Sequence, residues 1–307
     1  MIEKKKCEWN AWILYAIIFI VFWLTFMYAD ITITYTHSLR VWDCIWQGDI
    51  TKFYQVCYEN QYLGCSANYY FPLYLIFAIW NLPIWLIAKI IEINIYAVPC
   101  LLWCKTMVVI FVIGCIVMLK RILKEMKCQE ADYYVFIFAT SLIFFIPTMA
   151  VAQYDVISVF FTLCGLYCFL KEQKFSLRVC LIFSLAISLK FFALFPFFIL
   201  NLLYEKRILV LLKNMLLASL VSVLSIVLFS NSDAFQMTVT DVNGDFIGKL
   251  TQVTIDGGTG NISLFISCFL VVCILAYYLK FENRVQIIES CAWLMTFLFI
   301  DSVKKSL

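Results

Sequence analysis

The sequence predicts an all-α, polytopic membrane protein. Of its 307 residues, 64% are apolar and only 14% are charged, and the mean hydropathy is +0.93. Soluble domains average about 45–50% apolar and about 25% charged residues. Apolar runs of about twenty residues recur along the chain, and each can cross a hydrocarbon layer of roughly 30 Å as a helix. We expect about 8–9 membrane helices and further juxtamembrane helices on the outer surface, all in one transmembrane domain covering residues 1–307.

The first predicted helix covers residues 9–29 and follows three lysines at positions 4–6. This start resembles a signal peptide, but the apolar run is too long, no small-x-small cleavage site follows it, and more membrane segments come after it. We therefore expect a permanent anchor. Asp30 ends the run. Moving an ionised carboxylate to the bilayer centre costs roughly 2.5–3.5 kcal/mol, so Asp30 is expected at the far membrane face.

An outer loop is predicted over residues 30–96. Its first forty residues are rich in Tyr and Trp, which suits short helices lying at the headgroup level. Its last part, residues 71–91, is apolar but is interrupted by Pro72 and Pro83. Whether this segment crosses the membrane decides the topology of everything after it.

Four clusters of cations favour a segment 71–91 that stays on the outer face. If it crossed, all four clusters would lie outside, against the positive-inside rule. If it does not cross, they lie inside with the N-terminal lysines, which makes the N-terminus cytoplasmic. The clusters are Lys120/Arg121/Lys124/Lys127, Lys171/Lys174/Arg178, Lys206/Arg207/Lys213 and Lys280/Arg284.

The remaining elements follow from the apolar runs. Core helices are predicted over residues 97–229, a second outer loop over 230–261 and the last two helices over 262–301. Within the core, residues 179–204 are too short for two full spans and contain Lys190 and Pro196, so two short helices are expected to meet near Lys190. Prolines and glycines gather in the outer segments. Because broken backbone is tolerated at membrane depth only beside protein or a wet cavity, the working cavity is expected to open outward.

Cysteine and histidine usage argues against a metal centre. Most of the fourteen cysteines lie inside apolar runs, where they behave as small hydrophobes, and no CxxC pair is present. The single histidine, His37, excludes a His-rich site. We expect no cofactor, no metal site and no nucleic-acid partner. Three cysteines share the first outer loop and are candidates for one disulfide: Cys44, Cys57 and Cys65.

Three places put polar groups at the same outer depth: Asp30, the pair Gln153 and Asp155, and Lys190. Each has a purely structural interpretation, as a helix-end acid in water, a turn whose Asp155 is an N-cap, and a snorkelling lysine. Lys190 fits this least, because it lies about eleven residues into an apolar run and needs a partner. Two carboxylates and a cation at one depth favour a site for a phosphate-bearing lipid and a proton acceptor.

The order of these motifs resembles the GT-C superfamily of polyprenyl-phosphate-sugar glycosyltransferases over roughly residues 10–205. The similarity lies in a lysine-rich start, a first helix ending in an acid, a long aromatic outer loop and three short motifs. Those motifs are Tyr-x-Pro-Leu (Tyr70, Pro72, Leu73), Gln-x-Asp (Gln153, Asp155) and Lys-x5-Pro (Lys190, Pro196).

The resemblance implies a role for each residue. Asp30 would be the catalytic base, Asp155 would assist acceptor or metal binding, and Lys190 would contact the donor phosphate. Gln153 and Tyr70 would bind substrate. The partners would be a polyprenyl-phosphate-linked sugar and a lipid or glycan acceptor. A lipid phosphate is already a good leaving group, so one base and one cation suffice for a single, inverting displacement at the outer face of the cell membrane.

Two departures from the superfamily pattern and two competing interpretations remain. Many members carry a second acid two residues after the first, where this chain has Thr32, and many have further helices or a soluble domain beyond the point corresponding to Leu307. A transporter or lipid-linked-sugar flippase would use the same charged groups to line a path. A non-catalytic subunit of an envelope-polymer assembly would use the Gly-rich second outer loop for docking.

Overall fold

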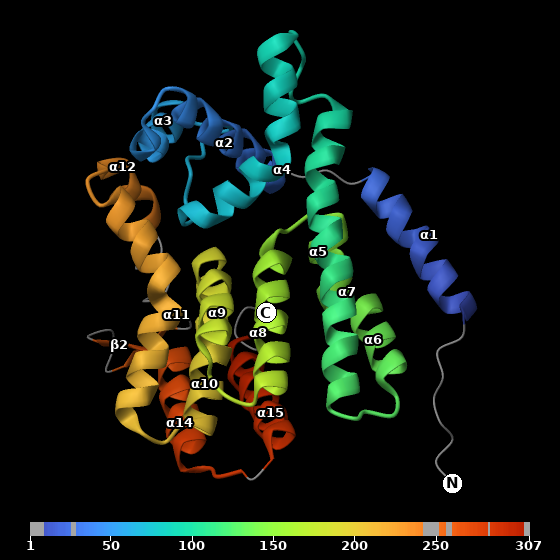
Figure 1. The fold of residues 1–307 in the computed structure, drawn as a ribbon, viewed down its shortest axis with the longest axis vertical. Coiled ribbons are helices and arrows are strands. Elements are labelled where there is room, and N and C mark those ends of the chain that lie inside the picture. The colour runs from blue at the N-terminus through green and yellow to red at the C-terminus, as the bar shows by residue number, and fades with distance from the viewer. Residues whose placement is uncertain (1–8, 26–28, 242–251, 256–259, 282, 304–307) are drawn as a thin grey trace.

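The computed structural model describes residues 9–25, 29–241, 252–255, 260–281 and 283–303 (Figure 1). This part of the chain is helical apart from a two-stranded antiparallel hairpin, β1 (Gln252–Ile255) and β2 (Gly260–Ser263). The predicted helical fold class is therefore confirmed.

A row of four helices forms the middle of the molecule: α5 (Val98–Glu125), α8 (Asp155–Glu172), α9 (Leu177–Leu189) and α11 (Ile208–Phe229) (Figure 1). Two glycines let neighbouring helices in this row approach closely. A Cβ at Gly165 would lie 2.6 Å from the Phe183 ring of α9, and a Cβ at Gly114 would lie 2.8 Å from the Phe160 ring of α8. Small residues at helix contacts are the usual device for packing helices in lipid, where water exclusion does not drive association.

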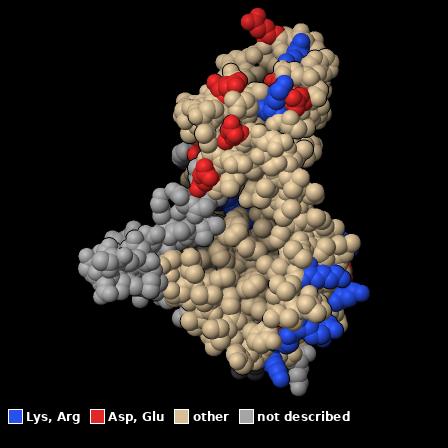
Figure 2. Space-filling model, turned by 90° about the vertical axis from the view of Figure 1, so that its left-hand side faces the viewer, with Lys and Arg blue, Asp and Glu red and all other residues tan. Residues whose placement is uncertain are grey.

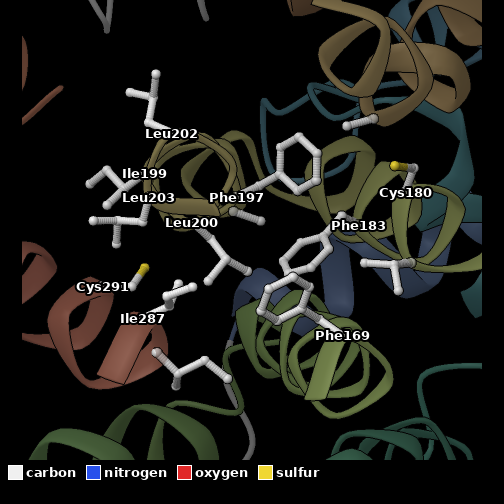
Figure 3. Close-up of a cluster of buried hydrophobic side chains, with 14 of the residues drawn as sticks. Phe169, Cys180, Phe183, Phe197, Ile199, Leu200, Leu202, Leu203, Ile287 and Cys291 are labelled. Atoms are coloured by element: carbon white, nitrogen blue, oxygen red, sulfur yellow. The ribbon is translucent and has the colours of Figure 1, made fainter. Parts of the chain in front are cut away.

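Further helices extend this row and cover it. Beyond α5 come α1 (Trp9–Thr25), α6 (Ala131–Thr140), α7 (Leu142–Phe145) and the π-helical turn η2 (Ile146–Ala150). Helix α10 (Leu194–Tyr204) packs against α9, and α14 (Leu264–Tyr278) and α15 (Arg284–Val303) pack against α10. Figure 3 shows the core that joins them, in which Phe169, Phe183 and Phe197 from three helices are fully buried.

The segment predicted as the first outer loop folds into helices that lie at one end of the row. They are α2 (Ala29–Trp46), the 3-10 turn η1 (Ile50–Lys52), α3 (Phe53–Glu59) and α4 (Phe71–Ile90) (Figure 1). The short helix α12 (Asp233–Phe235) and the π-helical turn η4 (Gln236–Asp241) join them after α11. The Tyr54 ring holds this group together, since its centroid is 4.8 Å from those of Phe229 and Phe235.

The expected 8–9 membrane helices are not confirmed. By length and composition, three helices of the described chain can cross a membrane: α4, α5 and α11. The number rises to five if two bent pairs each form one span, α1 with α2 at 64° and α6 with α7 and η2 at 55°. The shortfall arises because α9, α10 and α14 have 13, 11 and 15 residues, fewer than the roughly 20 that a full span needs.

The predicted break at Lys190 is confirmed. Lys190 is extended, with φ −152° and ψ 120°, and it separates α9 from the 3-10 turn η3 (Phe191–Ala193) that leads into α10. The chain also turns back there. Tyr204 at the end of α10 donates a hydrogen bond from its hydroxyl to the Gln173 carbonyl, just before α9, at 3.1 Å. Both short helices therefore reach the same end of the molecule.

The four cation clusters gather at that end, which we call the cationic end. Lys171 after α8 pairs with Glu125 at the end of α5 at 2.7 Å, and the Arg284 guanidinium donates to the Gln173 side chain at 3.0 Å. The Tyr277 hydroxyl of α14 donates to the Lys206 carbonyl at 3.3 Å. Figure 2 shows a group of Lys and Arg toward the bottom of one face, whereas the Asp and Glu on this face lie toward its top, together with some Lys and Arg.

Helix α4 keeps both of its ends at the opposite end of the molecule, which we call the Asp30 end. Tyr69, just before α4, contacts Lys190, and Lys89 in its last turn pairs with Asp43 of α2 at 2.9 Å. Near the middle of α4, the Trp80 ring stacks on Trp103, in the second turn of α5, at 4.9 Å. Although α4 is long enough to be a span, its contacts place it alongside only the first part of α5.

Candidate functional site

The centre of the candidate site is an ion pair between Lys190 and Asp155. The Lys190 ammonium lies 2.9 Å from the Asp155 carboxylate and donates to the Tyr69 hydroxyl at 3.2 Å. It is also 4.5 Å from the centroid of the Tyr69 ring, close enough for a cation–π attraction. The Lys190 side chain is 24% exposed and that of Asp155 44%. Lys190 thus has the partner that its apolar surroundings require, and both side chains of the pair remain partly exposed at the surface of the molecule.

The local backbone explains how Asp155 reaches this position. The π-helical turn η2 ends the preceding helix, and Ala152 then adopts a left-handed conformation with φ +53°. The Gln153 backbone N–H donates to the Pro147 carbonyl at 2.8 Å, which closes the turn. Asp155 then begins α8, where a carboxylate is favoured by the positive end of the helix dipole. Gln153, which is half-buried, lies two residues before Asp155.

Tyr154 connects this turn to α2. It is buried, and its ring meets the rings of Tyr69 at 5.6 Å and Phe77 at 5.4 Å in edge-to-face contacts. Its hydroxyl accepts a hydrogen bond from the Thr34 hydroxyl at 2.9 Å. The start of α8 is therefore fixed to the first turns of α2, the helix that carries Asp30.

Asp30 lies in the first turn of α2 and is exposed. It precedes Thr34 by four residues, so the two side chains share a face of the helix, separated by about 6 Å along its axis. Within the described chain, Asp30 has neither an ion pair nor a hydrogen bond, and it does not contact the Lys190–Asp155 pair. The structure brings Asp155 and Lys190 together. Asp30 lies one helical turn before Thr34, which hydrogen-bonds to Tyr154, the residue next to Asp155.

Tyr70 takes a different place from the one expected. It is the N-cap residue of α4, and its ring faces Phe235 at 6.4 Å, on the side of the aromatic group around Tyr54. The tyrosine that contacts Lys190 is its neighbour, Tyr69. The two side chains point different ways because Tyr70 has extended backbone, with φ −63° and ψ 148°.

Lys105 is a second buried cation, for which the sequence motifs above predict no role. Its side chain is 1% exposed on α5, and its ammonium donates to the Phe22 carbonyl near the end of α1 at 2.7 Å. A cation at the C-terminus of a helix is favoured by the helix dipole. Lys105 therefore ties α1 to α5 close to the point where the chain continues toward Asp30. The sequence does carry a sign of this role, because Lys105 is a charged residue inside an apolar run and a charge at that depth needs a partner.

His37 has a structural role in α2. It is buried, its Nε2 donates to the Cys65 carbonyl at 3.1 Å, and its Nδ1 accepts from the Arg40 guanidinium at 3.0 Å. Burial, assisted by the Arg40 charge, lowers the pKa of His37 to about 4. No group of three or more His, Cys, Asp or Glu in the described residues could hold a metal ion. The cysteines considered for a disulfide, Cys44, Cys57 and Cys65, are all free thiols.

No family model, curated protein or solved structure matches this chain. The GT-C resemblance therefore rests on the short motifs alone, and the function has to be argued from the site itself. That site offers an exposed carboxylate that has no partner among the residues the structure describes, an accessible ammonium held by an acid and a tyrosine, and surrounding aromatic rings.

Proposed function

We propose that the protein is an integral membrane glycosyltransferase that moves a sugar from a polyprenyl-phosphate donor to an acceptor hydroxyl on a lipid or glycan. The observation that carries this proposal is the Lys190–Asp155 pair, set at a break between two helices and joined to α2 through Tyr154 and Thr34. A cation placed at a break in an apolar run is costly unless it has a partner or a ligand. A lipid phosphate is a ligand that suits it.

The residues divide the reaction as follows. Asp30 takes the proton of the acceptor hydroxyl, whose oxygen forms a bond to the anomeric carbon of the sugar. The bond from that carbon to the phosphate oxygen breaks, and the negative charge on the departing polyprenyl phosphate is stabilised by Lys190. Asp155 holds Lys190 and contacts the acceptor, while Gln153 binds substrate. Tyr70, whose ring faces Phe235, takes no part in this proposal, and Tyr69 positions the Lys190 ammonium. One displacement without a covalent intermediate inverts the anomeric centre.

The proposal includes an orientation. The cationic end faces the cytoplasm, as the positive-inside rule requires, and the Asp30 end with α2, α3 and α4 lies on the outer face. The donor's polyprenyl chain then stays in the bilayer while its phosphate reaches Lys190 at the level of the broken helix. The contacts that hold both ends of α4 at the Asp30 end support this orientation.

The test is to incubate purified protein with a panel of polyprenyl-phosphate sugars and to measure the release of polyprenyl phosphate. In Asp30→Asn, we expect transfer to fall by about 10²–10⁴-fold, the usual contribution of a general base, while donor binding survives. The matched control is Glu92→Gln, which neutralises an exposed acid in the loop after α4.

Two results would overturn the proposal. One is an Asp30→Asn variant that transfers sugar as fast as the wild type. The other is a wild-type protein that releases no polyprenyl phosphate from any donor but moves a lipid-linked sugar across vesicle membranes, which would identify a flippase. A non-catalytic subunit would do neither.

A further inference from the structure

A long crevice runs along α8 and α9 from the cationic end, and its charged mouth lies at the end of α9 opposite to Lys190. It consists of two adjoining cavities of about 560 and 410 Å³ between α5, α8 and α9. Both are lined by Phe161, Arg178 and Ile182, so they form one continuous feature, which we call the α8–α9 crevice. Each volume falls in the range of about 300–1,000 Å³ that is usual for small-molecule sites.

The two halves of the crevice differ in chemistry. The larger cavity is apolar except for Arg178, and its walls are Phe161, Leu177, Leu181, Ile182 and Leu185. The smaller cavity is lined on its polar side by Arg121, Lys171, Glu172 and Arg178. An apolar trough therefore runs along α9 and meets a charged mouth. Two of its wall residues, Leu177 and Leu181, are exposed in the structure.

The charges of the mouth favour an anion. Glu172 is 3.9 Å from Arg178, at the limit of an ion pair, and the Arg178 side chain is 73% exposed. Lys171 pairs with Glu125, but its own side chain is 50% exposed. Within the described chain Arg121 makes no ion pair. Such exposed pairs are worth at most about 1 kcal/mol, so they yield readily to a ligand with a stronger charge.

We propose that the α8–α9 crevice binds an anionic phospholipid. The phosphate accepts charge-assisted hydrogen bonds from Arg121 and Arg178, and an acyl chain lies in the trough lined by Leu181 and Leu185. Basic pockets between membrane helices on the cytoplasmic side are typical binding sites for acidic lipid headgroups. The apolar trough next to the mouth argues for a lipid, because a free phosphate would leave it empty. This site is separate from the proposed transferase site and does not depend on it.

The test compares two lipids with the same acyl chains on the purified protein. Dioleoyl-phosphatidylglycerol is expected to stay bound in native mass spectrometry and to raise the melting temperature, whereas dioleoyl-phosphatidylcholine does neither. The double variant Arg121→Gln/Arg178→Gln should bind phosphatidylglycerol about tenfold more weakly, because two charge-assisted hydrogen bonds are lost. Lys174→Gln/Lys280→Gln removes the same charge from exposed positions at the same end and should bind like the wild type.

A third variant distinguishes a lipid-binding crevice from a surface that attracts anionic lipids through its charge alone. Leu181→Trp fills the trough without changing any charge, and because Leu181 is partly exposed we expect the protein to fold normally. The Leu181→Trp variant should retain less phosphatidylglycerol in native mass spectrometry than the wild type does. The proposal fails if phosphatidylcholine binds as well as phosphatidylglycerol, if the control double variant loses as much as Arg121→Gln/Arg178→Gln, or if inorganic phosphate stabilises the wild type as much as the lipid does.

Discussion

Lys190 illustrates how a single charge in an apolar run constrains a membrane protein. The ammonium needs a partner at that depth, and it takes both a carboxylate and a tyrosine hydroxyl. The sequence alone shows the need, because the run around Lys190 is otherwise apolar. The sequence does not show which tyrosine is the partner of Lys190. Tyr69 and Tyr70 are neighbours with similar surroundings in the sequence, and only the path of the chain into α4 turns one toward Lys190.

Substitutions of the pair separate its structural role from donor binding. Asp155→Asn and Lys190→Gln should each lower stability by about 1–3 kcal/mol, because each leaves a partly buried partner without its counterpart. The double variant should regain most of that loss, since two neutral amides can bond to each other. Donor affinity, measured by titration with a polyprenyl-phosphate sugar, should nevertheless fall both in the single Lys190→Gln variant and in the double variant. A double variant that recovers both stability and donor affinity would show that the pair is structural only.

His37 makes the stability of the helices at the Asp30 end depend on pH. Its pKa is about 4 in the folded protein against 6.5 without burial, so the unfolded chain binds a proton that the folded one does not. This contribution to stability is complete above pH 6.5 and is lost as the pH falls from 6.5 toward 4, by up to roughly 3 kcal/mol. The melting temperature of wild type in detergent should therefore fall more between pH 7 and pH 5 than that of His37→Gln. Equal slopes would contradict the assignment.

At the scale of elements, the close contact between α8 and α9 holds both the Lys190–Asp155 pair and the α8–α9 crevice in place. Gly165 allows it, since any Cβ there would meet the Phe183 ring. Gly165→Val should cost about 1–3 kcal/mol through overpacking and lower the melting temperature. Val159→Ala, at an exposed position of the same helix, is the control and should be close to neutral. A fully stable Gly165→Val variant would mean that the two helices can separate freely.

The break between α9 and α10 could be expected from the sequence, whereas the lengths of the membrane helices could not. Lys190 and Pro196 both interrupt one apolar run, and a chain that must return its cations to one side has to turn there. Counting apolar runs overestimated the spans, because α9, α10 and α14 are apolar yet short. Their apolar character serves packing within the bundle, as the fully buried Phe183 and Phe197 demonstrate.

For the whole molecule, the distribution of charge predicts the orientation. Lys89 lies at the Asp30 end and Lys124 at the cationic end. Single cysteines at these two positions, in a chain whose accessible native thiols such as Cys65 have been replaced, should react with an impermeant maleimide from opposite faces of intact vesicles. We expect Lys89→Cys to react from the outer face and Lys124→Cys from the cytoplasmic face. The reverse assignment, with Lys89→Cys reached only from the cytoplasmic face, would show that α4 crosses the membrane and would overturn the outer placement of the proposed transferase site.

The amino-acid sequence alone indicates that this chain is helical, that several of its helices are apolar enough to cross a membrane, that its four cation clusters belong at one end and that Lys190 needs a partner. These properties follow from composition and from the cost of placing a charge in lipid, which are local quantities. The packing of the helices determines that Asp155 and Tyr69 meet Lys190, that Tyr154 joins α8 to the helix of Asp30, and that a crevice with a cationic mouth opens beside α8. Those contacts join residues as much as 121 positions apart, so they depend on how the helices pack.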